Sequence, residues 1–126
     1  MSPLNNIPIN AQANTGTVTS VAIDGRFLFS GSIQAIFSDP TAAGTLTLQG
    51  SNDPMEGLQQ SSPNVYIPIH WDTVKNGSIS ATATVAAGAL TTISMQWLNY
   101  RWLRVVWVSG AGAGTLTVNG FFQSGV

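Results

Sequence analysis

The sequence predicts an all-β protein, an antiparallel two-sheet sandwich of jelly-roll-like form with an extended N-terminal arm. Runs of alternating apolar and polar residues recur along the chain, and this period of two is typical of half-buried strands. Residues that favour turns, chiefly Gly, Asn, Asp and Pro, separate the runs. No segment requires a helix. Short strands joined by Gly-rich turns favour a jelly roll or a related sandwich.

The N-terminal segment 1–16 predicts an arm. It is rich in Asn, Pro and small residues, and Ile7 and Ile9 stand in it without a sustained period. Such a segment cannot bury itself and becomes ordered only by lying on something else. We therefore expect an arm without regular secondary structure over 1–16 and a sandwich domain over 17–126. In an assembly the arm would cross to a neighbouring subunit, which makes Ile7 and Ile9 candidate interface residues.

Eight strands are expected after the arm, each from its own alternation. Their ranges are 17–23, 27–37, 45–49, 65–71, 78–85, 89–97, 101–108 and 114–122. Asn76-Gly77 predicts a hairpin, because both residues accept the positive φ angles of a type I′ turn. Pro68 has no N–H to donate, so the strand over 65–71 should lie at an edge or carry a bulge.

Two further segments are distinctive. The strands within 43–50 and 113–120 share a Gly-Thr-Leu-Thr pattern, which fits paired or pseudo-symmetric positions but does not make a repeat protein. The longest irregular stretch is 51–64, and loops of that length in compact domains are often functional.

The composition excludes several classes of protein. Charged residues make up 7% of the chain, against about 25% in ordinary soluble domains. The net charge is -1 and the four basic residues form no run, so nucleic acid is not an expected partner. There is no cysteine, which excludes disulfides and thiolate metal sites. We find neither a signal peptide nor an apolar run of about 18 residues that could span a membrane.

The chain offers little for catalysis. His70 is the only histidine, and alternation places it on the less apolar face of its strand, as a surface or hydrogen-bonded residue. Asp53 and Glu56 share a loop but lack the spacing that specifies a calcium loop. The Gly-rich segment 110–114 precedes a strand rather than the helix that a phosphate site uses. We expect no catalytic residue, no metal, no cofactor and no enzymatic activity.

The segment 97–108 is the strongest candidate for a functional surface. Its strand places Leu103, Val105 and Trp107 on one face. Trp102, Arg104, Val106 and Val108 lie on the other. Because both faces are apolar, the second should also be covered, either by the chain itself or by another subunit. The even-numbered residues are therefore candidate interface residues. Two alternatives stay open: an ordinary core strand, and a sugar-stacking platform formed by Trp97, Tyr100 and Trp102.

The segments 44–54, 100–105 and 112–118, together with Trp71, resemble a β-sandwich module of tailed-phage virion proteins, which include head decoration (cement) proteins and tail or fibre components. The resemblance implies a non-enzymatic protein on the surface of the virion. The small size and the absence of fibre repeats favour a decoration protein that binds and stabilises the assembled head. Its expected partners are the major capsid protein or other virion proteins, and it is expected to form a homo-oligomer, by preference a trimer. The alternatives are a tail, baseplate or fibre-tip subunit, and a carbohydrate-binding module that recognises host surface glycans.

Overall fold

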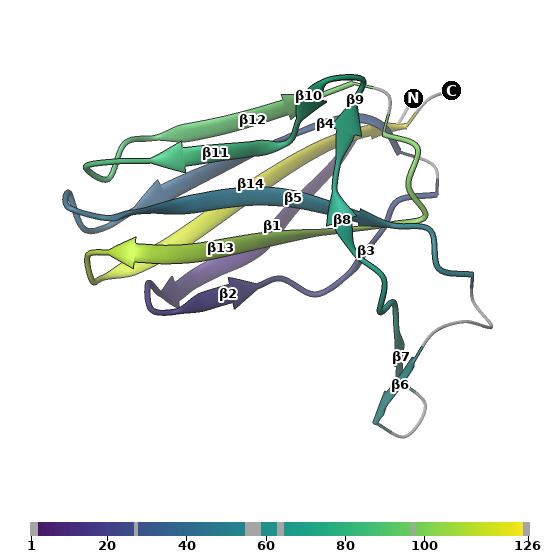
Figure 1. The fold of residues 1–126 in the computed structure, drawn as a ribbon, viewed down its shortest axis with the longest axis horizontal. Helices are drawn as coiled ribbons and strands as arrows, with labels where there is room; N and C mark the ends of the chain where they lie inside the picture. The colour runs from purple at the N-terminus through teal and green to yellow at the C-terminus, as the bar shows by residue number, and fades with distance from the viewer. Residues whose placement is uncertain (1–2, 27, 55–58, 63–64, 97, 125–126) are drawn as a thin grey trace.

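Two antiparallel sheets packed face to face form the fold (Figure 1). The structure is a computed structural model that describes residues 3–26, 28–54, 59–62, 65–96 and 98–124. Sheet A has the order β1 (Pro3–Ala13), β14 (Thr115–Ser124), β4 (Leu28–Phe37) and β12 (Thr91–Met95). Sheet B has the order β11 (Thr82–Val85), β5 (Ala43–Ser51), β13 (Trp102–Ala111) and β2 (Thr17–Thr19), with β3 (Ile23–Asp24) beside β13 and β8 (Asp72–Thr73) beside β5.

The strand order is that of a jelly roll. The connections 14–16, 38–42, 86–90 and 112–114 each join a strand of one sheet to a strand of the other, and all four lie at one end, called here the turn end (Figure 1). The opposite end, called the loop end, carries the longer connections. Such crossings between two antiparallel sheets are typical of jelly rolls. The predicted all-β sandwich is confirmed, and no described segment is a helix that could span a membrane.

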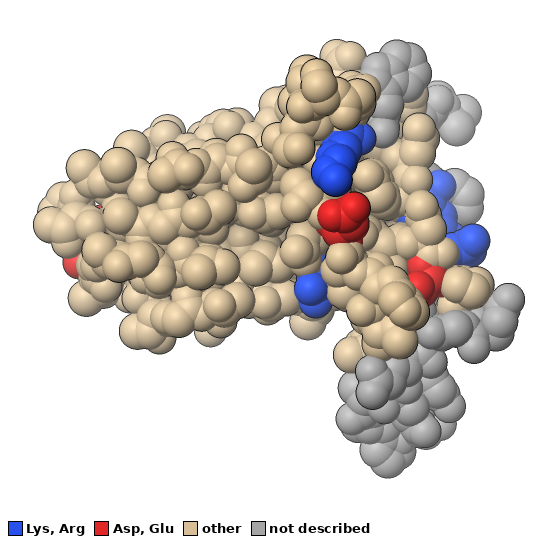
Figure 2. Space-filling view, in the orientation of Figure 1, with Lys and Arg blue, Asp and Glu red and all other residues tan. Residues whose placement is uncertain are grey.

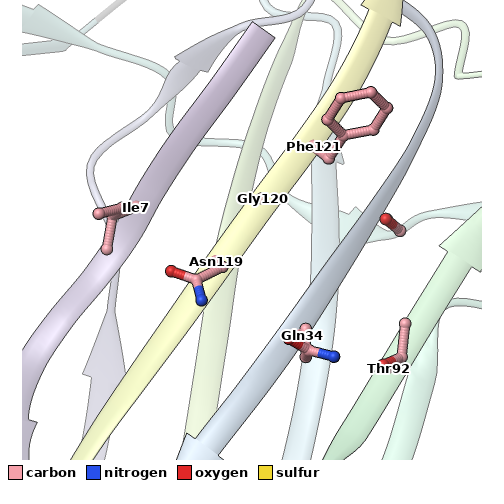
Figure 3. Close-up of a pocket in the computed structure, with 7 residues that line it drawn as sticks. Ile7, Gln34, Thr92, Asn119, Gly120 and Phe121 are labelled. Atoms are coloured by element: carbon pink, nitrogen blue, oxygen red, sulfur yellow. The ribbon is translucent and has the colours of Figure 1, made fainter. Parts of the chain in front are cut away.

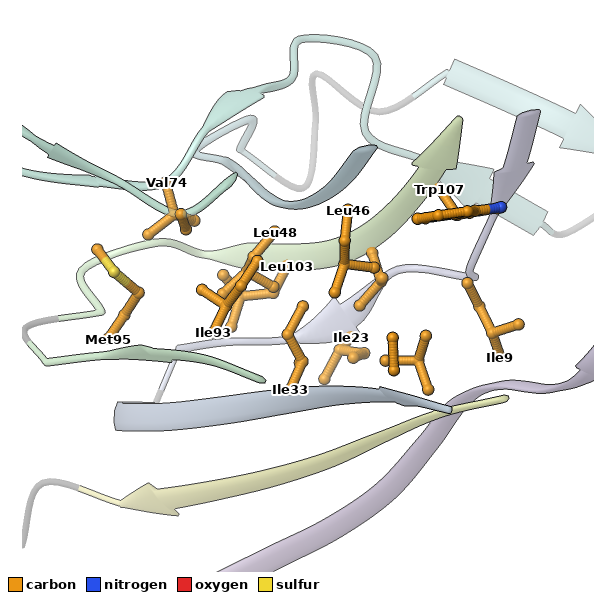
Figure 4. Close-up of a cluster of buried hydrophobic side chains, with 14 of the residues drawn as sticks. Ile9, Ile23, Ile33, Leu46, Leu48, Val74, Ile93, Met95, Leu103 and Trp107 are labelled. Atoms are coloured by element: carbon orange, nitrogen blue, oxygen red, sulfur yellow. The ribbon is translucent and has the colours of Figure 1, made fainter. Parts of the chain in front are cut away.

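The core lies between the sheets and is filled mainly by the inward-facing residues of the long strands of both sheets (Figure 4). Trp107 is fully buried, and its ring centroid lies 4.9 Å from that of Phe37 across the core. Leu46 on β5 and Leu116 on β14 are both fully buried. They belong to the two segments of shared pattern, which occupy inner positions in opposite sheets and do not pair with each other.

The predicted arm is wrong for most of its length. Residues Pro3–Ala13 form β1, which pairs with β14 at the edge of sheet A. Ile9 is only 2% exposed and belongs to the core, so it is not available as an interface residue in this fold. This strand is not apparent from the sequence pattern because its register shifts between Asn6 and Ile9 and again between Ile9 and Gln12. Bulges of this kind break the period of two.

Four predicted strands are shorter than expected or divided. The range 17–23 forms β2 and β3, and the range 89–97 forms β12. The strand over 65–71 ends at Ile67, the residue before Pro68. Among the described residues, β7 (Val65–Ile67) pairs only with β6 (Gln59–Ser62), in a hairpin that projects from the body (Figure 1). Within the predicted strand 78–85, β10 (Ile79–Ser80) pairs with β9 (Lys75–Asn76), and β11 starts afterwards in sheet B. Ile79 is therefore 61% exposed rather than on the core face.

The Asn76-Gly77 hairpin exists but has a different turn from the one predicted. Asn76 pairs with Ile79, so Gly77 and Ser78 are the two central residues. Gly77 alone has a positive φ, 63°. A positive φ confined to the first central residue, here a Gly, is the requirement of a type II′ turn, whereas type I′ needs it at both central positions.

Charge is concentrated at the loop end. Figure 2 shows the acidic and basic side chains around β8 and beyond it, while most of the visible body carries neither. Asp24 pairs with Trp102 at the start of β13, and Asp72 pairs with Gly50 near the end of β5. Asp39 lies in the 38–42 connection at the turn end, where it accepts hydrogen bonds from the backbone N–H groups of Ala113 and Thr41. The bond from Ala113 thus joins the 112–114 and 38–42 connections at the turn end, where Asp39 is the charged residue of the four connections.

Candidate functional site

The outer face of sheet B divides into two halves along β13. Trp102, Arg104, Val106 and Val108 point outward, opposite the fully buried Leu103, Val105 and Trp107. This arrangement confirms the assignment of the odd-numbered face to the core. Trp102 and Arg104 lie toward the loop end, and Val106 and Val108 toward the turn end.

Arg104 is held in place by two neighbours. Its Nε donates a hydrogen bond to Oε1 of Gln49 at 2.7 Å, and its guanidinium carbon lies 4.3 Å from the centroid of the Trp71 ring. Burial lowers the pKa of Arg104 from its ordinary value, but an arginine remains protonated in proteins. A cation over an aromatic face contributes about 0.5–2 kcal/mol, depending on its desolvation. Arg104 therefore fastens the connection that carries Trp71 to the sheet.

Trp102 strengthens this attachment, and Trp71 forms a hydrogen bond within the connection itself. The indole N–H of Trp102 donates to the carbonyl oxygen of Asp53 at 3.1 Å, and that of Trp71 donates to the carbonyl of Pro68 at 3.1 Å. Trp102 and Arg104 are consequently half-buried. The connection between β5 and β8 covers the loop-end half of this face. The apolar pattern predicted that this face would be covered either by the chain itself or by another subunit, and here the chain itself covers it.

Asp53 organises the same connection. Its carboxylate accepts hydrogen bonds from the backbone N–H groups of His70, at 3.0 Å, and Ile69, at 2.7 Å, and its Oδ1 lies 2.9 Å from Nδ1 of His70. These bonds lower the pKa of Asp53, and the bond from the His70 backbone has the largest effect. The side chain of His70 is 78% exposed, which agrees with a surface, hydrogen-bonded histidine. Glu56 lies outside the described residues, and among those described no three His, Cys, Asp or Glu side chains gather to hold a metal.

The turn-end half of the face is different: it is an uncharged, two-row array of β-branched side chains. The register aligns Val106 with Thr47 and Thr19, and Val108 with Thr45 and Thr17. On the far side of β5, Thr82 and Thr84 continue the two rows. Val108 is 48% exposed. We call these eight residues the docking face: Thr17, Thr19, Thr45, Thr47, Thr82, Thr84, Val106 and Val108.

Alternation along the segment 97–108 predicted the outward position of the valines of this array, but nothing in that pattern pointed to the threonines. Their signal is the repeated Thr-x-Thr at 17–19, 45–47 and 82–84. This repeat indicates a shared surface only when the strand register is known, because the register aligns the three threonine pairs on the two sides of Val106 and Val108. Side chains aligned in this way across adjacent strands lie about 5 Å apart.

The remaining candidate residues lie apart from the docking face. Ile7 is 57% exposed on β1 of sheet A. Trp97 lies outside the described residues. Tyr100 is half-buried: its ring lies close above Gly50, and its hydroxyl accepts a hydrogen bond from the backbone N–H of Lys75 at 3.2 Å. The structure thus does not bring Tyr100 and Trp102 forward as a shared exposed platform, since each packs against its own chain.

No protein-family model and no curated protein matches the chain. Among solved structures it is similar to the SPBc2 prophage-derived protein YomS, with a TM-score of 0.54 and 9% identity, over 97% of this chain and 95% of that one. It also aligns over 99% of its length with 34% of a family two carbohydrate esterase from Cellvibrio japonicus (TM-score 0.41, 9% identity), and over 98% with 32% of a chain of infectious bursal disease virus strain Gx (TM-score 0.38, 11% identity). At these identities the likeness concerns the fold alone.

Proposed function

We propose that the chain is a non-enzymatic structural protein of a bacteriophage particle, and specifically a capsid decoration protein that binds the assembled head through its docking face. The likeness to a prophage-derived protein over nearly the whole of both chains supports the phage origin. The docking face supports the structural role, and it is the observation that carries the proposal.

A sheet face that stays in water normally carries charged side chains, which also prevent association with other sheets. The docking face presents methyl and hydroxyl groups over four strands and carries no Lys, Arg, Asp or Glu. On β13 the charged side chain belongs to the loop-end half, where Arg104 is already engaged by Gln49 and Trp71. Asp39, in the connection before β5, is engaged by the backbone N–H groups of Thr41 and Ala113. An uncharged surface costs less to desolvate than a charged one, and its hydroxyl groups can form hydrogen bonds with a partner, so it suits burial against another protein.

The function follows from mass action. A protein that binds the assembled head and not its separated subunits stabilises the assembly by its binding free energy. No group of the decoration protein has to react. The proposed homo-oligomer, by preference a trimer, would add avidity on a symmetric head, and sedimentation equilibrium of the isolated chain tests it.

The test uses particles produced from the genome that encodes the chain. Purified protein is incubated with these particles, and binding is measured by co-sedimentation and located by cryo-electron microscopy. We expect saturable binding to the head. Val108→Lys, which buries an unpaired charge at the docking face, should weaken binding at least about tenfold. Ile79→Lys, at a β-branched residue of the β9–β10 hairpin that is 61% exposed, is the matched control and should bind normally.

Density on the tail or baseplate in place of the head would overturn the decoration role in favour of a tail, baseplate or fibre-tip subunit. If Val108→Lys and Ile79→Lys bound equally well, the docking face would not be the attachment surface.

A further inference from the structure

The outer face of sheet A, on the opposite side of the sandwich, contains a hollow that the proposed function does not use. Its volume is about 510 Å³, within the range of small-ligand sites. It lies over β14, β4 and β12 and is bordered by β1 (Figure 3). The residues that matter for its chemistry are Ile7, Ser32, Gln34, Thr92, Asn119 and Phe121.

A row of neutral polar side chains crosses this hollow. Asn119 pairs with Gln34, and Gln34 pairs with Thr92, so the two amides and the hydroxyl stand side by side on three adjacent strands. The three lie toward the same face in Figure 3. Neither amide side chain takes part in a hydrogen bond within the described chain, although the structure records such bonds for Gln49 and Asn14. Each amide therefore has both donors and an acceptor available to a ligand.

Two apolar side chains adjoin the row. Phe121 follows Asn119 by two residues on the same face of β14 and is 43% exposed, and Ile7 is exposed on β1. The hollow carries no acidic or basic residue among those that line it. It therefore combines an aromatic ring, an aliphatic side chain and a row of uncharged donors and acceptors.

We propose that this hollow binds an uncharged saccharide. Sugar hydroxyl groups donate and accept hydrogen bonds, as the side chains of Asn119, Gln34 and Thr92 do, and the C–H face of a sugar ring can pack on Phe121. A charged glycan would enter a site without a counter-charge. A purely apolar ligand would desolvate the amide row without replacing its hydrogen bonds, which is unfavourable.

Two protein occupants fit less well. A peptide added as a strand would pair along the outer edge of β1 or β12, the terminal strands of sheet A, and not over the faces of β14 and β4, which supply most of the residues that line the hollow. A second copy of the chain would place hollow against hollow in a two-fold dimer, because such an interface uses the same patch on both subunits, and the space would remain unfilled.

The test titrates the isolated, isotope-labelled chain with neutral oligosaccharides, using cellotetraose, maltotetraose, chitotetraose and a galactose tetramer, and with sialyllactose as the charged comparison. Backbone NMR shifts report the site. We expect at least one neutral oligosaccharide to bind saturably, with shifts centred on Gln34, Asn119 and Phe121. Sialyllactose should not compete.

Gln34→Ala and Phe121→Ala should each weaken binding about tenfold, the loss expected for a ligand hydrogen bond or a stacked ring. Thr45→Ala, on the docking face, is the control and should bind like the original chain. If Phe121→Ala fails to fold, Asn119→Ala replaces it. The proposal is overturned if no neutral oligosaccharide shifts these residues at millimolar concentration, or if the shifts centre on Tyr100 instead. Because no phage particle is involved, these results are independent of head binding.

Discussion

The hydrogen bond between Trp107 and Asn14 should couple the N-terminal segment to the core of sheet B. The indole Nε1 of Trp107 donates to Oδ1 of Asn14 at 2.7 Å, and both residues are almost completely buried. Asn14 directly follows β1. The bond therefore crosses from the connection between β1 and β2 to a central strand, and its loss should be measurable in the free energy of unfolding.

Trp107→Phe keeps an aromatic ring beside Phe37 but removes the N–H donor. The buried Oδ1 of Asn14 then lacks its partner, at a cost of about 1–3 kcal/mol. The smaller ring also leaves a cavity, which adds on the order of 1 kcal/mol. Asn14→Ala should cost about 1–3 kcal/mol, because it leaves the indole N–H unpaired. In the double variant neither group is left without its partner, so the total loss should fall below the sum by about 1–2 kcal/mol.

Urea unfolding of the four proteins, followed by fluorescence and circular dichroism, measures this coupling free energy. Trp107→Ala provides the upper bound, about 3–5 kcal/mol for loss of a buried tryptophan. Additive losses within about 0.3–0.5 kcal/mol would refute the reasoning, because Asn14 and Trp107 would then act independently and the N-terminal segment would not be anchored at this point.

Three further outcomes are expected. Ile9→Ala should lower the free energy of unfolding by about 2–5 kcal/mol, and Ile7→Ala, at an exposed residue, by less than about 0.5 kcal/mol. Equal small losses in urea unfolding would support the original prediction of a free N-terminal arm. Hydrogen bonds lower the pKa of Asp39, and the bond from the Ala113 backbone has the largest effect. The contribution of Asp39 to stability is therefore present above the unfolded pKa of about 4 and is lost as the pH falls through the lower folded value. Asp39→Asn should therefore flatten the acid side of the melting temperature plotted against pH, and an unchanged slope would argue against these bonds. His70→Ala should change the free energy of unfolding by less than about 0.5 kcal/mol. Neither the original chain nor this variant should hydrolyse p-nitrophenyl acetate, and a turnover that is lost on the substitution would show that the chain is an enzyme.

The strands with a clean alternation could be predicted from the sequence. The expected ranges 27–37 and 101–108 agree closely with β4 and β13, because one face of each strand is buried in the core and the other is not. β1 could not be found in this way. Its two register shifts and the positive φ of Ala11, 48°, change which side chains face the core along the strand, and Pro8 adds to the appearance of an arm.

The functional surfaces were predictable only in part. Alternation correctly separated Trp107 from Trp102, since it depends on neighbours along one strand. The cover of Trp102 and Arg104 comes from Asp53 and Trp71, which are distant in the sequence, and no local pattern specifies that contact. The threonine rows and the amide row likewise need a register between strands that are far apart in the chain.

Protection of the docking face on the particle tests the central claim most directly. The chain has no cysteine, so a single introduced thiol is a unique probe. Thr84→Cys places one on the docking face, and Thr92→Cys places one on the opposite sheet at a residue that is also exposed. The rate of maleimide labelling is measured for each variant, free and bound to particles. We expect binding to slow the labelling of Thr84→Cys at least about tenfold and to leave Thr92→Cys unchanged. Equal labelling of Thr84→Cys in both states would contradict attachment through the docking face.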